Sequence, residues 1–320
     1  MNIKRLVSIL IGVTLIAFGV GFLSLRLAGS YSINANRDKN YSVNINKSWA
    51  NNSNGKYKEI DEKEFISLDG IKEIDVDVDM ASIKIVTEDR EDLSLHYYGT
   101  ISNHIRTDLS KKVFGNKLVL EAMAQINTNK NLNKSMKADL YLDIIIPSSY
   151  ANKLNLKTDL GSANIEGLKL DKMYAYGELG DVNVKNSTFK ELDIKASLGE
   201  INIDNVVAAK NKLNADLGSI KINNLKGSLD AKTNLGSIDI KYDKLDWDIK
   251  AESSSGSIKI VLPKNSNFTI EANTNLGSIE SSMPLDIKEK TNTRLSGKSG
   301  NGKNSITLIV DLGSINIEGK

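Results

Sequence analysis

Two carboxylates, Asp181 and Glu200, are the first residues whose spacing could support catalysis. Each follows a glycine in a recurring segment, ELGD in one case and SLGE in the next. If successive segments stack, the two side chains lie on adjacent rungs, and paired carboxylates can act as acid and base in glycoside hydrolysis. The same position is serine in the other copies, which favours a structural ladder of short polar side chains. The sequence therefore predicts no catalytic residue.

Metal and cofactor chemistry has equally few candidates. Asp75, Asp77 and Asp79 alternate along DVDVDM, so that they project from one face of a strand about 7 Å apart, where carboxylates could bind calcium. No second strand offers a complementary cluster, which favours a solvated face. His96 and His104 are the two histidines, and there is no cysteine, which excludes disulfides and thiolate chemistry. We expect no metal site and no cofactor.

The charge balance argues against a nucleic-acid partner. The 320 residues include 42 Lys and Arg against 40 Asp and Glu, for a formal net charge of +2. Only six of the basic residues are Arg, which is the usual reader of phosphates and base edges. The many Gly-Ser pairs precede strand patterns rather than helices, so they are not expected to cradle phosphates.

The elements that carry these residues belong to an internal repeat. The segment DLGSIKI returns with small changes along the second half of the chain, and its glycines are separated by 19, 19, 19, 18, 20, 21 and 36 residues. These repeat glycines are Gly161, Gly180, Gly199, Gly218, Gly236, Gly256, Gly277 and Gly313. An earlier, degenerate copy, MASIKIV, has Ala81 in place of the glycine. Such self-similarity at a fixed period is the signature of a solenoid.

Within each period, apolar residues alternate with polar ones on both sides of the glycine, as in a strand with one buried face. The apolar positions one before and two after the glycine are separated by an odd number of steps. A straight strand would turn its face over there, so the chain must bend at the glycine. This parity predicts that Leu217, Ile220 and Ile222 form one rung of a stacked core.

These patterns predict an all-β, single-stranded parallel β-helix or β-solenoid of about 19-residue coils, in which each coil packs on its neighbours. Residues 151–320 form the regular solenoid, with a loop at 281–305, and the last coil leaves an open edge near Lys320 that must be covered. Residues 59–150 are expected to form irregular β opening coils.

The N-terminus predicts a membrane anchor. Residues 1–5 would form a cytoplasmic stub, 6–28 a transmembrane helix and 29–58 an Asn/Ser-rich linker. The uncharged stretch Leu6–Leu25 is long enough to span the hydrocarbon core, which favours an uncleaved single-pass anchor over a cleaved signal peptide. Lys4 and Arg5 favour a cytoplasmic N-terminus and an extracytoplasmic solenoid.

Several of these features together resemble a known family. The N-terminal anchor, the IIIPSSY strand end, the repeated LGSI-x-I coils and the final GKSGNGKNSITLIVDLGSINI look like the bacterial putative-adhesin, β-strand-repeat family of unknown function. The resemblance covers roughly residues 65–320. It implies a cell-envelope protein without assigned catalysis, similar to components encoded beside envelope-stress regulators.

We therefore expect a non-enzymatic, membrane-anchored, extracytoplasmic module for adhesion, binding or scaffolding. Its ligand would be a cell-surface glycan or protein, recognised by outer polar columns that include Asp216, Ser219 and Lys221. Two alternatives remain open at this point. One is a β-helix enzyme that cleaves cell-wall polysaccharide, and the other is a component of envelope-stress signalling.

Overall fold

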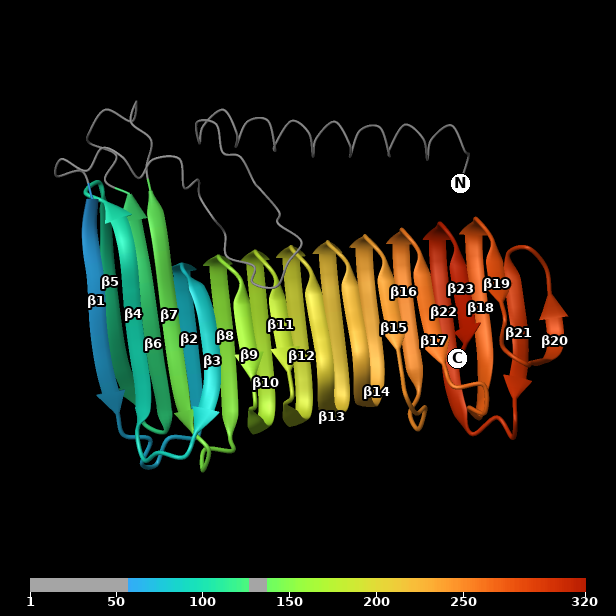
Figure 1. Ribbon diagram of the computed structural model, residues 1–320, viewed down its shortest axis with the longest axis horizontal. Helices are drawn as coiled ribbons and strands as arrows, with labels where there is room; N and C mark the ends of the chain where they lie inside the picture. The colour runs from blue at the N-terminus through green and yellow to red at the C-terminus, as the bar shows by residue number, and fades with distance from the viewer. Residues whose placement is uncertain (1–56, 127–136) are drawn as a thin grey trace.

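The computed structural model describes residues 57–126 and 137–320, which form 23 β-strands and no helix. One hydrogen-bonded sheet winds into an elongated rod with two long faces (Figure 1). No segment of this described part has the helical length and apolar character that crossing a bilayer requires. The stub, the anchor and most of the linker expected over residues 1–58 lie outside the described residues.

The first face of the rod contains the strands that lead into the repeat glycines. In spatial order it consists of β5 (Ile105–Phe114), β6 (Lys117–Ile126), β2 (Glu73–Met80), β8 (Lys153–Leu160), β10 (Lys169–Leu179), β12 (Thr188–Leu198), the later parts of β13 (Ile201–Leu217) and β14 (Ile220–Leu235), β16 (Ile249–Ser255), β22 (Asn304–Leu312), β18 (Phe268–Leu276), β21 (Arg294–Ser299) and β20 (Asp286–Lys290).

The second face contains the strands that follow the glycines. Its spatial order is β1 (Tyr57–Ile66), β4 (Leu93–Ser102), β7 (Ala138–Pro147), β3 (Ser82–Glu88), β9 (Ala163–Glu166), β11 (Val182–Lys185), the first parts of β13 and β14, β15 (Ile238–Lys241), β17 (Ile258–Leu262), β23 (Ile315–Gly319) and β19 (Ile279–Ser281). From β3 to β19 all neighbours on this face are parallel, as in a solenoid-like stack.

The core lies between the two faces and consists of the alternating apolar residues. On one coil, Ile194 and Ala196 point inward before the corner and Ile201 points inward after it, each at most 2% exposed. Like residues stack on like residues, because the parallel register places Ile201 beside Ile220. Burial of these aliphatic side chains in continuous rows is the main source of stability for a fold without disulfides.

The prediction that Leu217 belongs to this core is wrong. Leu217 is 42% exposed, whereas Ile220 is fully buried and Ile222 is 3% exposed. The inward series on the first face ends three residues before the glycine, at Ala215 in this coil. The chain has already begun to turn at the leucine, so that its side chain projects beyond the edge of the sheet.

The coils do not stack in chain order at the C-terminal end. The last coil, β22–β23, lies between β16–β17 and β18–β19, and it pairs in parallel with both (Figure 1). The open edge expected near Lys320 is therefore not at the end of the rod. At the other end, the first parallel coil, β2–β3, is likewise inserted between β6–β7 and β8–β9.

Antiparallel strands cover the ends of the rod. The segment 281–305, expected as a loop, contains the hairpin β20–β21, in which β21 pairs with the outermost coil strand β18. Leu295 of this hairpin is 2% exposed, which anchors it to the core. At the opposite end, β5 pairs with β6, and β4 pairs with both β1 and β7. These additions protect the parallel strands that they pair with from edge-to-edge aggregation, whereas β19 pairs with β23 alone among the described strands.

A second corner is built on left-handed backbone in four successive coils. Six residues after the repeat glycine stand Gly167, Asn186, Asn205 and Asn224, with φ values of 75°, 48°, 53° and 54°. Asparagine tolerates this conformation better than other side chains except glycine, because its short amide can bond locally. The amides also connect rungs, since the Asn224 side-chain oxygen accepts a hydrogen bond from the Asp243 N–H at 3.0 Å.

We expect the replacement Asn205→Ala to lower the free energy of unfolding by about 1 kcal/mol, because alanine disfavours the left-handed region. Asn205→Gly is the matched control, and it should lie closer to the wild type because glycine adopts this φ freely. Chemical denaturation of both variants checks the difference. Equal loss in the two variants would show that the amide contacts, rather than the backbone conformation, explain the asparagine.

Candidate functional site

The glycine corner depends on close contact between successive backbones. A Cβ atom built on Gly180 would lie 2.4 Å from the Gly161 carbonyl oxygen, and one on Gly199 would lie 2.2 Å from that of Gly180. The φ values of these two residues are 142° and 155°. The other repeat glycines, Gly161, Gly218, Gly236, Gly256, Gly277 and Gly313, each meet a neighbouring carbonyl oxygen in the same way, at 1.7–2.1 Å. No other residue type fits this approach.

Backbone hydrogen bonds are complete along the corner. Seven of the repeat glycines, all except Gly277 on the last rung, donate their N–H to the carbonyl oxygen of the residue that precedes the glycine of the next rung in space. Examples are Gly180 to Leu198 at 2.9 Å and Gly218 to Leu235 at 3.0 Å. Hydroxyls inside the corner add to these contacts, since Thr233 Oγ1 donates to the Gly218 carbonyl at 2.9 Å. The corner is consequently a regular, rigid edge that runs along the rod.

The leucines before the glycines form an exposed apolar ridge along this edge, which we call the leucine ridge. Its members in spatial order are Met80, Leu160, Leu179, Leu198, Leu217, Leu235, Ser255, Leu312 and Leu276. The exposed fraction of Leu179, Leu198, Leu217, Leu235 and Leu276 is 42–57%. Nine rungs at a spacing of about 4.8 Å make a ridge of about 38 Å.

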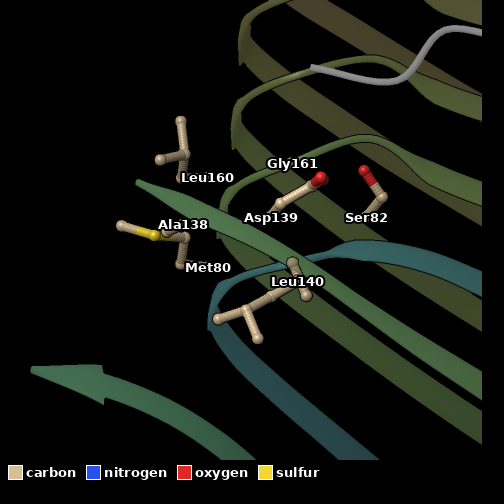
Figure 2. Close-up of a pocket in the computed structure, with 8 residues that line it drawn as sticks. Met80, Ser82, Ala138, Asp139, Leu140, Leu160 and Gly161 are labelled. Atoms are coloured by element: carbon tan, nitrogen blue, oxygen red, sulfur yellow. The ribbon is translucent and has the colours of Figure 1, made fainter. Parts of the chain in front are cut away.

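Figure 2 shows the end of the ridge nearest the opening strands, where Met80 and Leu160 project to the same side of the ribbon. A small cavity of about 20 Å³ lies here between Ala81 and residues 138–140 of β7. It has room for about one water molecule and not for a ligand. Ala81 occupies the glycine position at this end of the ladder, next to that cavity.

The residue after each glycine has a structural role. The Ser162 hydroxyl oxygen accepts the Asp181 N–H at 3.2 Å, and the Ser219 hydroxyl oxygen accepts the Ser237 N–H at 3.2 Å. A short side chain with an oxygen atom at this position thus accepts a hydrogen bond from the backbone N–H of the next rung. Ser219 was expected to belong to an outer recognition column, but its oxygen is engaged within the corner.

Of the two paired carboxylates, Asp181 follows the same rule and Glu200 does not. Asp181 Oδ1 accepts the Glu200 N–H at 2.8 Å, while both oxygens of Glu200 accept hydrogen bonds from Lys221 Nζ at 2.9 and 2.7 Å. Burial raises the pKa of Asp181; the Glu200 N–H opposes this rise and the Glu200 charge adds to it. One carboxylate is therefore bonded to backbone and the other to an ammonium group.

We predict that Asp181→Asn raises the free energy of unfolding at neutral pH by less than about 1 kcal/mol, since asparagine keeps an oxygen acceptor without the buried charge. The folded-state pKa of Asp181 is raised, so the folded wild type binds this proton more tightly than the unfolded chain. Wild-type stability should therefore gain as the pH falls through that raised pKa, until the unfolded group is also protonated below 3.8.

Denaturant unfolding of Asp181→Asn and the wild type from pH 7 to pH 3.5 measures this difference. The advantage of the variant should shrink as the pH falls. An advantage that is independent of pH would contradict the explanation by charge burial, and Ser219→Asn serves as an uncharged control at the equivalent position.

The three aspartates of β2 do not form a metal site in the described chain. Asp75 contacts Lys117 and accepts the Asn155 amide at 2.6 Å, whereas Asp79 accepts the Ala124 N–H at 3.0 Å. Burial would raise the pKa of Asp75, but the bonds from Lys117 and Asn155 outweigh it and lower the pKa. Among residues 57–126 and 137–320, no three His, Asp or Glu side chains are grouped to hold a metal ion.

The two histidines lie apart from any such group. His96 Nε2 lies 2.7 Å from Asp61 Oδ1, and the imidazole ring of His96 stacks on the Tyr98 ring.

An open groove of about 320 Å³ lies over the antiparallel pair β5–β6, where it is lined by Arg106, Asp108, Met123 and Gln125. These four side chains project from one face of a two-stranded hairpin and do not enclose a ligand.

The fold and its corner ladders define the chain as an all-β, solenoid-like repeat protein. It belongs to the Toastrack family, DUF4097, whose family model matches residues 71–318. This agrees with the resemblance to the adhesin-like β-strand-repeat family of unknown function. No curated protein matches the chain.

Several solved structures are similar to this chain. A putative adhesin from Bacteroides fragilis is 16% identical, with 82% of this chain and 97% of that chain covered and a TM-score of 0.47. A putative cell adhesion protein from Clostridium sporogenes is 14% identical, covering 82% and 100% at a TM-score of 0.28. A putative lipid binding protein from Parabacteroides distasonis is 16% identical, covering 83% and 98% at a TM-score of 0.35.

Proposed function

We propose that this protein is a non-catalytic binding or scaffold module of the bacterial cell envelope, with an adhesin-like role. Residues 6–28 anchor it in the membrane, and the β-solenoid extends outside the cytoplasm. One observation carries the proposal: the rod presents the same outward side chains at a fixed interval along a rigid edge, including an apolar ridge. Such a surface suits an extended partner that makes many equivalent contacts.

The paired carboxylates give the enzymatic alternative little support. A retaining or inverting glycosidase needs two carboxyl groups that face a substrate with different protonation states. Here Asp181 accepts a backbone N–H and Glu200 binds Lys221. A glycan-cleaving activity of the full chain that is lost in both Asp181→Ala and Glu200→Ala would overturn the proposed role.

The proposed extracytoplasmic location of the solenoid is tested by protease shaving of intact cells that produce the full chain. Trypsin added outside should degrade the solenoid while a cytoplasmic marker protein stays intact, because the rod lies beyond the membrane. The binding role is tested in the same cells by chemical crosslinking before lysis. A solenoid that is cleaved only after lysis would refute the extracytoplasmic placement, and a chain that crosslinks to nothing would refute the binding role.

A further inference from the structure

The leucine ridge is bordered by negative charge. The nine corner segments, counted from two residues before the glycine position to one residue after it, hold seven carboxylates and no Lys, Arg or His. On the side that precedes the leucines these are Asp79, Asp159, Glu178, Asp216 and Asp311, and on the other side Asp181 and Glu200. Asp159 and Glu200 form ion pairs with Lys157 at 2.9 Å and Lys221 at 2.7 Å, so the negative border rests mainly on the exposed Glu178, Asp216 and Asp311. Asp216 and Asp311 are exposed, and each accepts one amide hydrogen bond, from Asn234 at 3.0 Å and Asn275 at 2.9 Å.

The backbone of the ridge offers no edge for strand addition. The glycine N–H groups and the leucine carbonyls bond to each other from rung to rung, as between Gly199 and Leu217 at 3.3 Å. A partner that lies along the ridge must therefore satisfy its own backbone hydrogen bonds, which a helix does and an added strand does not. An amphipathic helix of about 20 residues is about 30 Å long and would cover most of the ridge.

From this geometry we propose that the leucine ridge is the docking surface for a basic amphipathic helix of a partner protein. The leucines contact the apolar face of the helix, and its Lys and Arg side chains pair with the exposed carboxylates Glu178, Asp216 and Asp311. The inference rests on the proposed binding role and names its surface and the chemistry of its partner.

Charge complementarity favours a basic helix over two other binding partners for the ridge, a second copy of the chain and an anionic bilayer. A second copy that presented the same ridge would bring carboxylates such as Asp216 against carboxylates, which is repulsive. A bilayer rich in anionic lipid would be repelled by the same groups. A cationic helix is instead attracted, and its affinity should fall as salt screens the attraction.

The test uses the full-length chain in zwitterionic phosphatidylcholine nanodiscs and a fluorescent 18-residue amphipathic peptide of Leu and Lys. Anisotropy should show saturable binding that weakens with salt. The variant Leu179→Ser, Leu198→Ser, Leu217→Ser should raise the dissociation constant at least tenfold. It should still fold, since these side chains are exposed and Ser255 already occupies one rung of the ridge. Trp247→Ser with Ile287→Ser removes two exposed apolar side chains elsewhere and should leave binding unchanged.

Charge is tested separately. Glu178→Gln with Asp216→Asn should weaken binding of the Leu/Lys peptide and reduce its salt dependence, and a peptide with Glu in place of Lys should not bind. Equal binding of the Lys peptide to the wild type and the triple serine variant would overturn the proposal. So would a ridge-dependent dimer in sedimentation, or ridge-dependent binding of phosphatidylglycerol vesicles in place of the peptide. If the peptide fails while crosslinks in cells capture a partner through another face, the binding role stands and this surface does not.

Discussion

Replacement of Gly180 by alanine is expected to lower the free energy of unfolding by at least about 3 kcal/mol. The added Cβ would lie 2.4 Å from the Gly161 carbonyl oxygen, which is backbone and cannot rotate away. The φ of 142° is also unfavourable for alanine. Because adjacent rungs share the corner, separation at one rung weakens the hydrogen bonds on both sides of it.

Gly177→Ala is the matched control for this prediction. Gly177 lies three residues earlier, within the strand β10 that leads into the corner, and its register partner on the next rung is Ala196. A Cβ there would meet the Val182 side chain at 3.1 Å, which a small movement relieves. We expect a change within about 1 kcal/mol in denaturant unfolding. Similar losses in Gly177→Ala and Gly180→Ala would contradict the account of the corner, because the added Cβ lies 2.4 Å from a backbone carbonyl oxygen at Gly180 and 3.4 Å from one at Gly177.

Truncation after Lys303 is expected to unfold the C-terminal part of the rod. This chain lacks β22 and β23, which lie between the coils β16–β17 and β18–β19. Their loss removes the parallel partner of β18 and β19 and exposes the apolar residues that β22 covers, such as Ala251 and Ala272. The amide hydrogens of β16–β19 should therefore lose their protection from exchange with solvent, while those of β8–β12 stay protected, since a solenoid can unfold locally.

The control is deletion of the hairpin β20–β21 by replacement of residues 284–301 with a short Gly-Ser linker. That hairpin pairs with one edge of β18 and covers no second coil, so protection should be reduced near β18 and retained in β16. If the coils were stacked in chain order, removal of the last coil would leave β18–β19 paired with β16–β17. Retained protection of β18–β19 in the truncated chain would thus contradict the inserted order.

The sequence predicts the coil well and the order of the coils poorly. The spacing of glycines such as Gly180 and Gly199 predicts stacked parallel strands, since only a fixed period brings like residues into register. The similarity of the coils to one another gives no information on the order in which they stack, because Ile258 and Ile279 are equally good neighbours for Ile315. The polar segment 281–305 has the composition of a loop, and its strands depend on pairing with β18, which composition does not record.

The leucine ridge was not predicted from the sequence because the alternation of apolar and polar residues was extended to the leucine before each glycine, one alternating position too far. Leu217 continues the inward series of Leu213 and Ala215 in the sequence, but the corner turns it outward. The period contains one overlooked signal, namely Asn186, Asn205 and Asn224 at a constant distance after the glycines. Asparagine at a fixed position of a repeat indicates left-handed backbone, and it would have located the second corner.

The exposure of the leucine ridge on a closed core is the central claim, and cysteine labelling tests it most directly. The chain contains no cysteine, so a single introduced thiol gives an unambiguous signal. In the folded full-length chain, Leu198→Cys should react with a maleimide at a rate close to that of the unfolded chain. Ile194→Cys, four residues earlier and fully buried, should react only after denaturation. Protection of both thiols until denaturation would place the leucines in the core and contradict the account.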